Sequence, residues 1–220
     1  MRTLPAAQRG ALLMIEIIDS GNAGYHRDLL DKQFRLRHEI FVGERGWTDF
    51  DIDGTHERDQ YDDDAAVYLV AADEIGTVAG GYRLYPTVLP HMLSEQFPHL
   101  VEGAIIRRHD VLELTRFAMR KSQRRSRHYF ELLAAIQEYG MMEGLSGFTS
   151  VINPLRIPIL QSFGFEIEPL GLPAMIDGDS TIAVLFHVNE QCHARVRDKV
   201  AIHDTVFGAA KASRQRASAR

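Results

Sequence analysis

Helical and strand-like patterns alternate along this chain, and their order constrains the fold more than any other sequence feature. Residues 26–43 repeat apolar side chains at helical spacing, as do residues 129–143, where Gly144 can end the helix. Short β-branched, aromatic or alternating runs predict strands at 66–72, 78–84, 112–119, 148–152 and 181–188. The order helix, strands, helix, strand, strand predicts one α/β sheet with helices on its faces.

The length of 220 residues suits one domain, and both ends of the chain differ from its middle. Met14 opens a patterned segment that residues 1–13 lack, so we expect 1–13 to be an extension and translation to start at Met14. Residues 208–220 turn small and basic, which predicts a flexible basic tail. The folded domain is therefore expected over residues 14–207.

Composition excludes several classes of protein. A net charge of −5 argues against a dedicated nucleic-acid binder, and the single cysteine, Cys192, fits a reducing compartment. No apolar run approaches the roughly 20 residues that span a bilayer. The 10 histidines lack metal-ligand spacing, and the common nucleotide-binding, zinc-protease and serine-hydrolase motifs are absent. We therefore expect a cytoplasmic protein with no metal, no nucleic-acid partner and no membrane insertion.

The functional signal is dispersed over the first half of the chain rather than gathered in one motif. Taken singly, each residue has an ordinary structural explanation: a surface arginine, a core tryptophan, a turn-forming aspartate or a structural ion pair. The set consists of Arg37, Phe41, Trp47, Asp59, Asp62, Arg83, Phe97, Glu113 and Arg116.

In this order and at this spacing, the set resembles that of the acyl-homoserine lactone synthases, the autoinducer synthases of quorum-sensing bacteria. The likeness covers most of residues 14–190, with Thr115 where the family more often has serine in Glu-x-Ser-Arg. It implies a single-domain α/β fold similar to the GCN5-related N-acetyltransferases, a three-layer α-β-α arrangement with a twisted mixed sheet and splayed central strands.

The resemblance also implies an activity. Such an enzyme is an acyltransferase that joins S-adenosylmethionine to the acyl group of a thioester, either acyl-CoA or acyl-carrier protein. N-acylation and lactonisation follow, and methylthioadenosine is released. S-adenosylmethionine is then a substrate, and no cofactor is expected.

The chemistry assigns roles to the residues that match. The attacking α-amine must lose a proton, and Glu113 is the candidate base, with Arg116 as the second catalytic candidate. Burial would raise the pKa of Glu113 and a nearby Arg116 would lower it, and the sequence leaves that balance open. The residues expected to bind S-adenosylmethionine are Arg37, Phe41, Trp47, Asp59, Asp62, Arg83 and Phe97.

The position of Arg116 raises a geometrical difficulty. In an unbroken strand Glu113 and Phe117 share a face, and Arg116 points away from it. Glu113 and Arg116 can serve one site only if a bulge intervenes or one of them is supportive. We expect Arg116 to join a buried ion-pair network that fixes the loop of Asp59 and Asp62.

The second half of the sheet is expected to line an acyl pocket. Ile152 stands where many family members that take 3-oxo groups have threonine, which favours donors without that group. Residues 169–173 resemble the branch that uses acyl-CoA, but the adjacent tryptophans frequent in that branch near 154–157 are missing, which argues against an aryl or branched acyl group. The pocket candidates are Phe117, Phe148, Ser150, Ile152, Phe163 and Phe165.

A basic cluster follows the strand that carries Glu113. It is either a solvated loop or a docking patch for the phosphates of CoA or for an acidic carrier protein, and the 169–173 resemblance slightly favours CoA. Its members are Arg120, Lys121, Arg124 and Arg125.

Two other functions stay open from the sequence. One is a GCN5-type N-acyltransferase for another amine, against which the absence of glycine from residues 120–127 argues. The other is a catalytically inactive binding protein of the same fold, against which the presence of Glu113 and the two aspartates argues.

Overall fold

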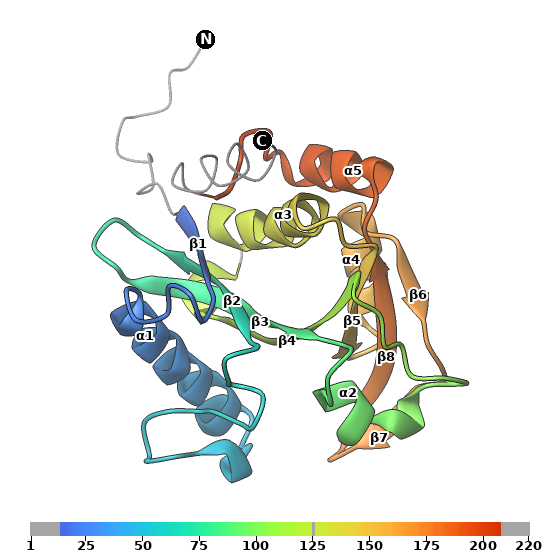
Figure 1. The fold of residues 1–220 in the computed structure, drawn as a ribbon, viewed down its shortest axis with the longest axis horizontal. Coiled ribbons are helices and arrows are strands. Elements are labelled where there is room, and N and C mark those ends of the chain that lie inside the picture. The colour runs from blue at the N-terminus through green and yellow to red at the C-terminus, as the bar shows by residue number, and fades with distance from the viewer. Residues whose placement is uncertain (1–13, 125, 208–220) are drawn as a thin grey trace.

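The structure, a computed structural model, describes residues 14–124 and 126–207. A single mixed sheet forms its centre, in the order β1-β2-β3-β4-β5-β8-β6 with β7 paired to β8 (Figure 1). Among the described strands, neighbours pair antiparallel except β4 with β5. The strands are β1 Met14–Ile18, β2 Val67–Ala72, β3 Val78–Pro86, β4 Val111–Met119, β5 Gly147–Ile152, β6 Ile167–Pro169, β7 Ala174–Ile176 and β8 Asp179–His187.

Helices cover both faces of the sheet, which gives the predicted three layers. α1 and α2 lie on one face and α3 and α5 on the other, with α5 against the outer side of α3 (Figure 1). α1 runs directly into a π-helix, His38–Glu44, and short 3-10 turns occupy Thr48–Phe50, Pro98–Leu100 and Lys121–Gln123. The α-helices are α1 Arg27–Arg37, α2 Met92–Glu95, α3 Arg127–Met142, α4 Arg156–Ser162 and α5 Glu190–Val200.

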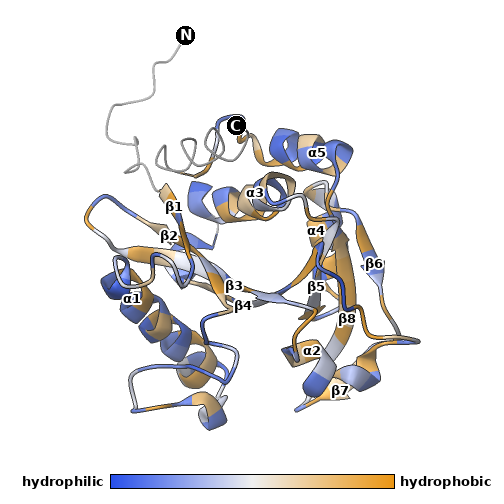
Figure 2. Ribbon diagram, viewed as in Figure 1, coloured by the Kyte–Doolittle hydropathy of each residue, from blue (hydrophilic) through white to orange (hydrophobic). Residues whose placement is uncertain are grey.

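Apolar residues fill the space on both sides of the sheet. The larger cluster packs α3 and α5 against the strands, with Leu132, Phe148 and Val196 fully buried. A smaller cluster under α1 includes Leu36 and Phe41. Figure 2 shows β5 and β8 as mostly hydrophobic, while the outer side of α1 is hydrophilic. This burial holds the helices to the sheet and leaves their polar sides to solvent.

The pairing of β4 with β5 is short, and it divides the sheet into two halves. It covers three register pairs, Val111↔Gly147, Leu112↔Phe148 and Glu113↔Thr149. Beyond Glu113, β4 stays with β3, and beyond Thr149, β5 stays with β8. We call this short pairing the seam; it is the predicted splaying of the central strands.

A bulge interrupts β4 directly after the seam. The β3–β4 register shifts between Gly81 and Arg83, and Arg116 opposite that shift has a φ of 53°. A non-glycine residue in this left-handed region is strained, so the surrounding contacts must hold it there. The bulge turns the Arg116 side chain to the face that carries Glu113 and moves Phe117 to the opposite one.

The predicted strands and helices all occur, the first helix as α1 plus the π-helix. The sequence patterns did not predict α2, α4, α5, β6 or β7. The proposed extension 1–13 and tail 208–220 lie outside the described residues. Within the part that the structure describes, no helix is both long enough and apolar enough to cross a membrane.

Candidate active site

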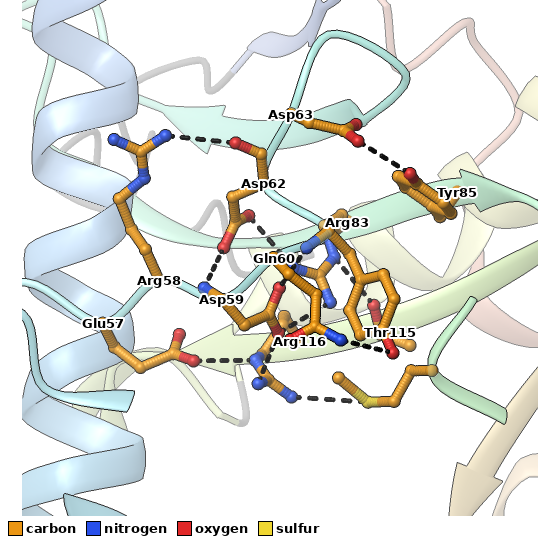
Figure 3. Close-up of polar contacts among 12 residues, drawn as sticks. Glu57, Arg58, Asp59, Gln60, Asp62, Asp63, Arg83, Tyr85, Thr115 and Arg116 are labelled. Atoms are coloured by element: carbon orange, nitrogen blue, oxygen red, sulfur yellow. Dashed lines mark hydrogen bonds and ion pairs between the residues drawn. The ribbon is translucent and has the colours of Figure 1, made fainter. Parts of the chain in front are cut away.

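Three arginines and three carboxylates meet in a buried network under β3 and β4. Figure 3 shows five of them, from the loop before β2 and from the two strands; the sixth, Arg37, comes from the last turn of α1. Each of these side chains is at most 5% exposed. The members are Arg37, Glu57, Asp59, Asp62, Arg83 and Arg116.

The ion pairs of this network close on themselves. Arg37 Nε donates to Glu57 Oε2 at 2.5 Å, and its two terminal nitrogens donate to Asp62 at 2.7 and 2.8 Å. Arg83 bonds both oxygens of Asp59 and lies 3.1 Å from Asp62 Oδ1. These contacts place Asp62 between Arg37 and Arg83.

Arg116 completes the ring. Its Nε donates to Glu57 Oε1 at 2.8 Å and its Nη2 to Asp59 Oδ2 at 2.6 Å. Every carboxylate therefore bridges two arginines, and every arginine bridges two carboxylates. We call these six residues the charge ring; its formal charges cancel, which is what makes such deep burial of ions tolerable.

The charge ring shifts the pKa values of its members. Burial raises the pKa of Asp62, but the guanidinium groups of Arg37 and Arg83 and the amide of Asp59 together outweigh it and hold that pKa well below the ordinary value. For Arg116, burial outweighs the charges of Glu57 and Asp59 and lowers the pKa. At Arg37 burial also lowers the pKa, but Asp62 and Glu57 together outweigh it and raise that pKa. Arg116 is thus the least well compensated arginine of the ring.

Aromatic residues cover the outer side of Arg116. Phe41 and Trp47 stack with ring centroids 5.2 Å apart, and the Arg116 guanidinium lies 4.8 Å from the centroid of Phe50. It also lies 5.6 Å from Phe41 and 6.0 Å from Trp47. The π-helix positions Phe41, so this aromatic ledge of Phe41, Trp47 and Phe50 is joined to the charge ring through Arg116.

Glu113 stands at the open end of the seam and is 1% exposed. Its carboxylate accepts hydrogen bonds from the backbone amides of Met92, at 3.1 Å, and Leu93, at 2.6 Å, at the start of α2. Burial raises the pKa of Glu113 despite these bonds. On its other side α2 is tied to the loop of the charge ring, because Tyr61 donates to Glu95 Oε2 at 2.8 Å.

The expected acyl-pocket residues lie on the opposite face of the sheet from Glu113. Phe117 stacks on Tyr82 at 5.0 Å, and Phe163 packs edge-on against Phe130 at 5.6 Å. Phe148 is fully buried in the same cluster, with Ile152 partly buried against it. The remaining two candidates are placed as follows: Ser150 donates to Leu114 O at 2.7 Å, and Phe165 packs on Phe186.

The basic cluster after β4 is paired with acids of the π-helix. Arg120 Nη1 lies 3.1 Å from Glu39 Oε2. Lys121 and Arg124 both approach Glu44, at 3.5 and 3.1 Å. These side chains are partly exposed, and Arg125 lies outside the described residues. The expected docking surface is therefore a set of exposed ion pairs rather than unpaired cations.

Phe97, the remaining candidate for S-adenosylmethionine binding, follows α2 and packs partly buried between two apolar clusters. Sequence reasoning missed Glu57, which completes the charge ring, and His91 and Thr149, which lie beside Glu113. Glu57 sits among many acids of one loop, where no spacing distinguishes it. Among the described residues no cluster of His, Cys, Asp or Glu could hold a metal ion.

Comparisons with known proteins show the family and the fold of this chain. The family model of the autoinducer synthases matches residues 22–196. The isovaleryl-homoserine lactone synthase of Bradyrhizobium diazoefficiens is 34% identical over 194 residues, which cover 88% of either chain. A CoA-dependent acyl-homoserine lactone synthase solved with SAM and isopentyl-CoA has a TM-score of 0.83 and 34% identity, covering 88% of this chain and 92% of that one.

A more distant likeness concerns the fold alone. An acyl-CoA N-acyltransferase from Pseudomonas aeruginosa has a TM-score of 0.56 at 15% identity, covering 79% of this chain and 98% of that one. The split sheet, the buried carboxylate at its opening and these likenesses define an acyltransferase with a GCN5-related fold. Within that class, the chain belongs to the autoinducer synthase family. The predicted fold, family and enzyme class are thereby confirmed.

Proposed function

We propose that this chain makes an acyl-homoserine lactone from S-adenosylmethionine and an acyl-CoA. The observation that carries the proposal is the placement of Glu113, a buried carboxylate of raised pKa at the point where β4 and β5 separate. Relatives that bind SAM with isopentyl-CoA, or are named isovaleryl-homoserine lactone synthase, support both substrates. The alternatives of another amine acceptor or an inactive protein have no comparable support.

The first step is amide formation. Glu113 accepts a proton from the α-ammonium of S-adenosylmethionine, directly or through water, because its raised pKa makes it a stronger base than an exposed carboxylate. The amine nitrogen then attacks the thioester carbon, the carbon–sulfur bond breaks, and the second proton lost by nitrogen passes to the departing thiolate to release CoA. Separated backbones beyond the seam can offer amide donors to the oxyanion that forms in between.

The second step is ring closure. A carboxylate oxygen of the methionine part attacks the γ-carbon, the bond from that carbon to the sulfonium breaks, and its electron pair stays on sulfur in methylthioadenosine. The leaving group is already cationic, so orientation supplies most of the catalysis. We assign this orientation to the aromatic ledge and to Arg116, which links the ledge to the charge ring.

In this proposal Asp59 and Asp62 hold the loop of the site in place and do not contact the substrate. Both oxygens of Asp62 already accept bonds from Arg37, and Asp59 Oδ1 and Oδ2 already meet Arg83 and Arg116. Their carboxylates therefore serve the substrate through the loop they fix. Phe41, Trp47 and Phe97 are proposed to contact the nucleoside side of S-adenosylmethionine.

The acyl chain is proposed to lie on the α3 face of the sheet. The Ser150 hydroxyl is already donated to Leu114 O, and Ile152 brings no hydrogen-bond donor. A 3-oxo group would find no partner on these two side chains, so acyl donors without it should be preferred. Rates with matched acyl-CoA and acyl-carrier-protein donors test the thioester; a tenfold preference for the carrier protein would contradict the proposed use of CoA.

Replacement of Glu113 tests the proposed reaction. Glu113→Gln should lower kcat by about 100-fold or more, because general-base catalysis typically contributes that much. Its amide group can accept from one of the α2 amides but not from both, so the melting temperature must be measured beside the rate. Glu113→Asp keeps the charge and should retain more activity than Glu113→Gln.

The assay follows methylthioadenosine release and lactone formation, with S-adenosylmethionine binding measured separately. Glu74→Gln, in an exposed turn, is the matched control and should behave as wild type. Glu113 acts as a base only when the pH exceeds its raised pKa. The fall of kcat/KM on the acid side should therefore occur at a pH above the ordinary pKa range of glutamate. A folded Glu113→Gln protein with near-normal kcat across pH would contradict the role of Glu113.

A further inference from the structure

Two buried polar atoms beside Glu113 have no hydrogen-bond partner among the residues that the structure describes. They are Thr149 Oγ1 and His91 Nε2. Both residues are completely buried. Folded proteins rarely leave such groups unpaired, because burial without a partner costs about 1–3 kcal/mol for each. Two of them next to one catalytic candidate therefore point to a ligand.

Thr149 faces the same side of the sheet as Glu113. The two residues are register partners in β4 and β5, so their side chains project from one face. Val151, two residues further along β5, packs against Leu93 of α2 and its neighbours, which places this face under α2. The Thr149 hydroxyl thus lies beside the Glu113 carboxylate at the last pair before the strands part.

His91 approaches from the chain segment that leads into α2. Its Nδ1 lies 2.9 Å from the carbonyl oxygen of Leu89, which can only accept, so Nδ1 carries the proton. In the neutral ring, Nε2 is then an acceptor. The next residue, Met92, donates its amide to Glu113, so the segment that carries His91 lies against the Glu113 carboxylate.

We propose that Glu113, Thr149 Oγ1 and His91 Nε2 together bind the α-ammonium group of S-adenosylmethionine. The three groups offer one acceptor for each N–H of a primary ammonium. One proton passes to the Glu113 carboxylate, and the two that remain on nitrogen are held by Thr149 and His91. The nitrogen lone pair then lies where that proton was, on the side of Glu113, which stands at the open end of the seam where the thioester arrives.

This inference rests on the proposed function, and it adds to it a binding role for His91 and Thr149 that the reaction alone does not require. It also predicts the class of amine. A primary amine satisfies both neutral acceptors after losing its proton, whereas a secondary amine leaves one of them unpaired. N-methylated analogues of S-adenosylmethionine should therefore be poor substrates even where space permits them.

Thr149→Val is the sharpest test, because valine has nearly the same shape and removes the hydroxyl alone. No bond within the described fold is lost, so the melting temperature should stay level or rise. The kcat/KM for S-adenosylmethionine should fall about tenfold or more, and Thr149→Ser should restore most of it. Thr181→Val, on β8 at a half-buried position, is the control: it removes an exposed hydrogen bond to Asp179 O and should leave kcat/KM unchanged.

His91→Asn tests the second acceptor. The asparagine amide can still donate to Leu89 O, but nothing replaces Nε2. We expect kcat/KM for S-adenosylmethionine to fall about tenfold and the KM for the acyl donor to stay unchanged, because only the binding of the amine is altered. An equal rise in both KM values would mean that α2 has moved, and would contradict this assignment.

The outcomes separate this inference from the proposed function. If the wild-type chain releases no methylthioadenosine with any acyl thioester, the proposed function is wrong. If the wild type is active and Thr149→Val keeps kcat/KM within twofold, the ammonium site is wrong while the function stands. A loss of both stability and activity in Thr149→Val that serine does not restore would also overturn it.

Discussion

The charge ring and the basic cluster after β4 are built from the same kinds of residue, and they differ in burial. In the ring, every carboxylate bridges two arginines and no side chain is more than 5% exposed. In the cluster, side chains of Arg120, Lys121 and Arg124 are 38–68% exposed and share Glu39 and Glu44. Burial decides which of two similar sets is a fixed part of the fold and which can exchange partners.

The physical reason lies in the solvent. Water screens the exposed pairs, so each contributes about 1 kcal/mol or less. In the ring, removing one charged member leaves each of its two neighbours with one counter-ion and leaves the buried ring with a net charge that water does not reach. A phosphate-bearing donor could therefore displace Glu44 from Lys121 and Arg124, whereas no ligand could open the ring without unfolding the loop.

Breaking the ring should have the largest effect. Asp62→Asn or Arg37→Met should lower the free energy of unfolding by about 3–5 kcal/mol, because each leaves the buried ring with one charge that no counter-ion balances. Urea denaturation measures this change. Arg35→Met on the same helix is the control: its pair with Asp31 is about half exposed and screened by water, so the free energy of unfolding should change little. Equal effects of Arg37→Met and Arg35→Met would contradict the comparison.

His56 makes a pH-dependent contact whose burial lies between that of the charge ring and that of the basic cluster. Its replacement should lower the free energy of unfolding less than breaking the ring does. His56 bonds Asp31 at 2.9 Å and Asp53 at 2.9 Å, next to the ring residue Glu57, and the bond to Asp31 raises its pKa. When folding raises the pKa of a group, the resulting stabilisation is complete at pH values below the unfolded-state pKa. It is lost as the pH rises through the folded-state pKa. His56→Gln should therefore destabilise more at pH 5.5 than at pH 9.

Denaturation of wild type and His56→Gln across that pH range checks the sign. The difference between the two proteins removes contributions from groups they share. A difference that grows with rising pH would show that the protonated imidazole does not hold the loop of Glu57 to α1.

The exposed cluster should give the smallest change in stability and a measurable change in binding. Glu44→Gln should leave the free energy of unfolding nearly unchanged, because water screens its pairs with Lys121 and Arg124. It frees Lys121 and Arg124, so the KM for the acyl donor should fall severalfold at low salt, and the gain should vanish at high salt. Glu74→Gln serves as control. An unchanged KM at low salt would remove the cluster from donor binding.

The sequence predicted the elements whose patterns are local. β2, β3, β4, β5, β8, α1 and α3 have apolar repeats that burial requires, so they could be recognised. α2 has four residues and depends on Glu113 and Tyr61 for its position, so no local pattern marks it. α5 carries a polar N-cap, Asn189, but its few apolar positions gave a weak signal.

The candidate site was predictable as a set of residues but not as a geometry. The conditional expectation of a bulge is met by the φ of Arg116, and its expected ion-pair network exists. Closure of the ring depends on Glu57, which only the tertiary fold brings between Arg37 and Arg116. The unpaired atoms of His91 and Thr149 are likewise a property of packing, and single residues in a sequence cannot reveal them.

The left-handed backbone at Arg116 has a consequence for which substitutions that position tolerates. Glycine suits the conformation best, yet it would delete the side chain that bridges Glu57 and Asp59. Lysine keeps the charge but cannot span two carboxylates, and β-branched residues fit neither requirement. At position 116 the backbone conformation thus favours glycine, whereas the two ion pairs require arginine. In a library of all substitutions at 116, the variants that are easiest to fold locally should be among the least active.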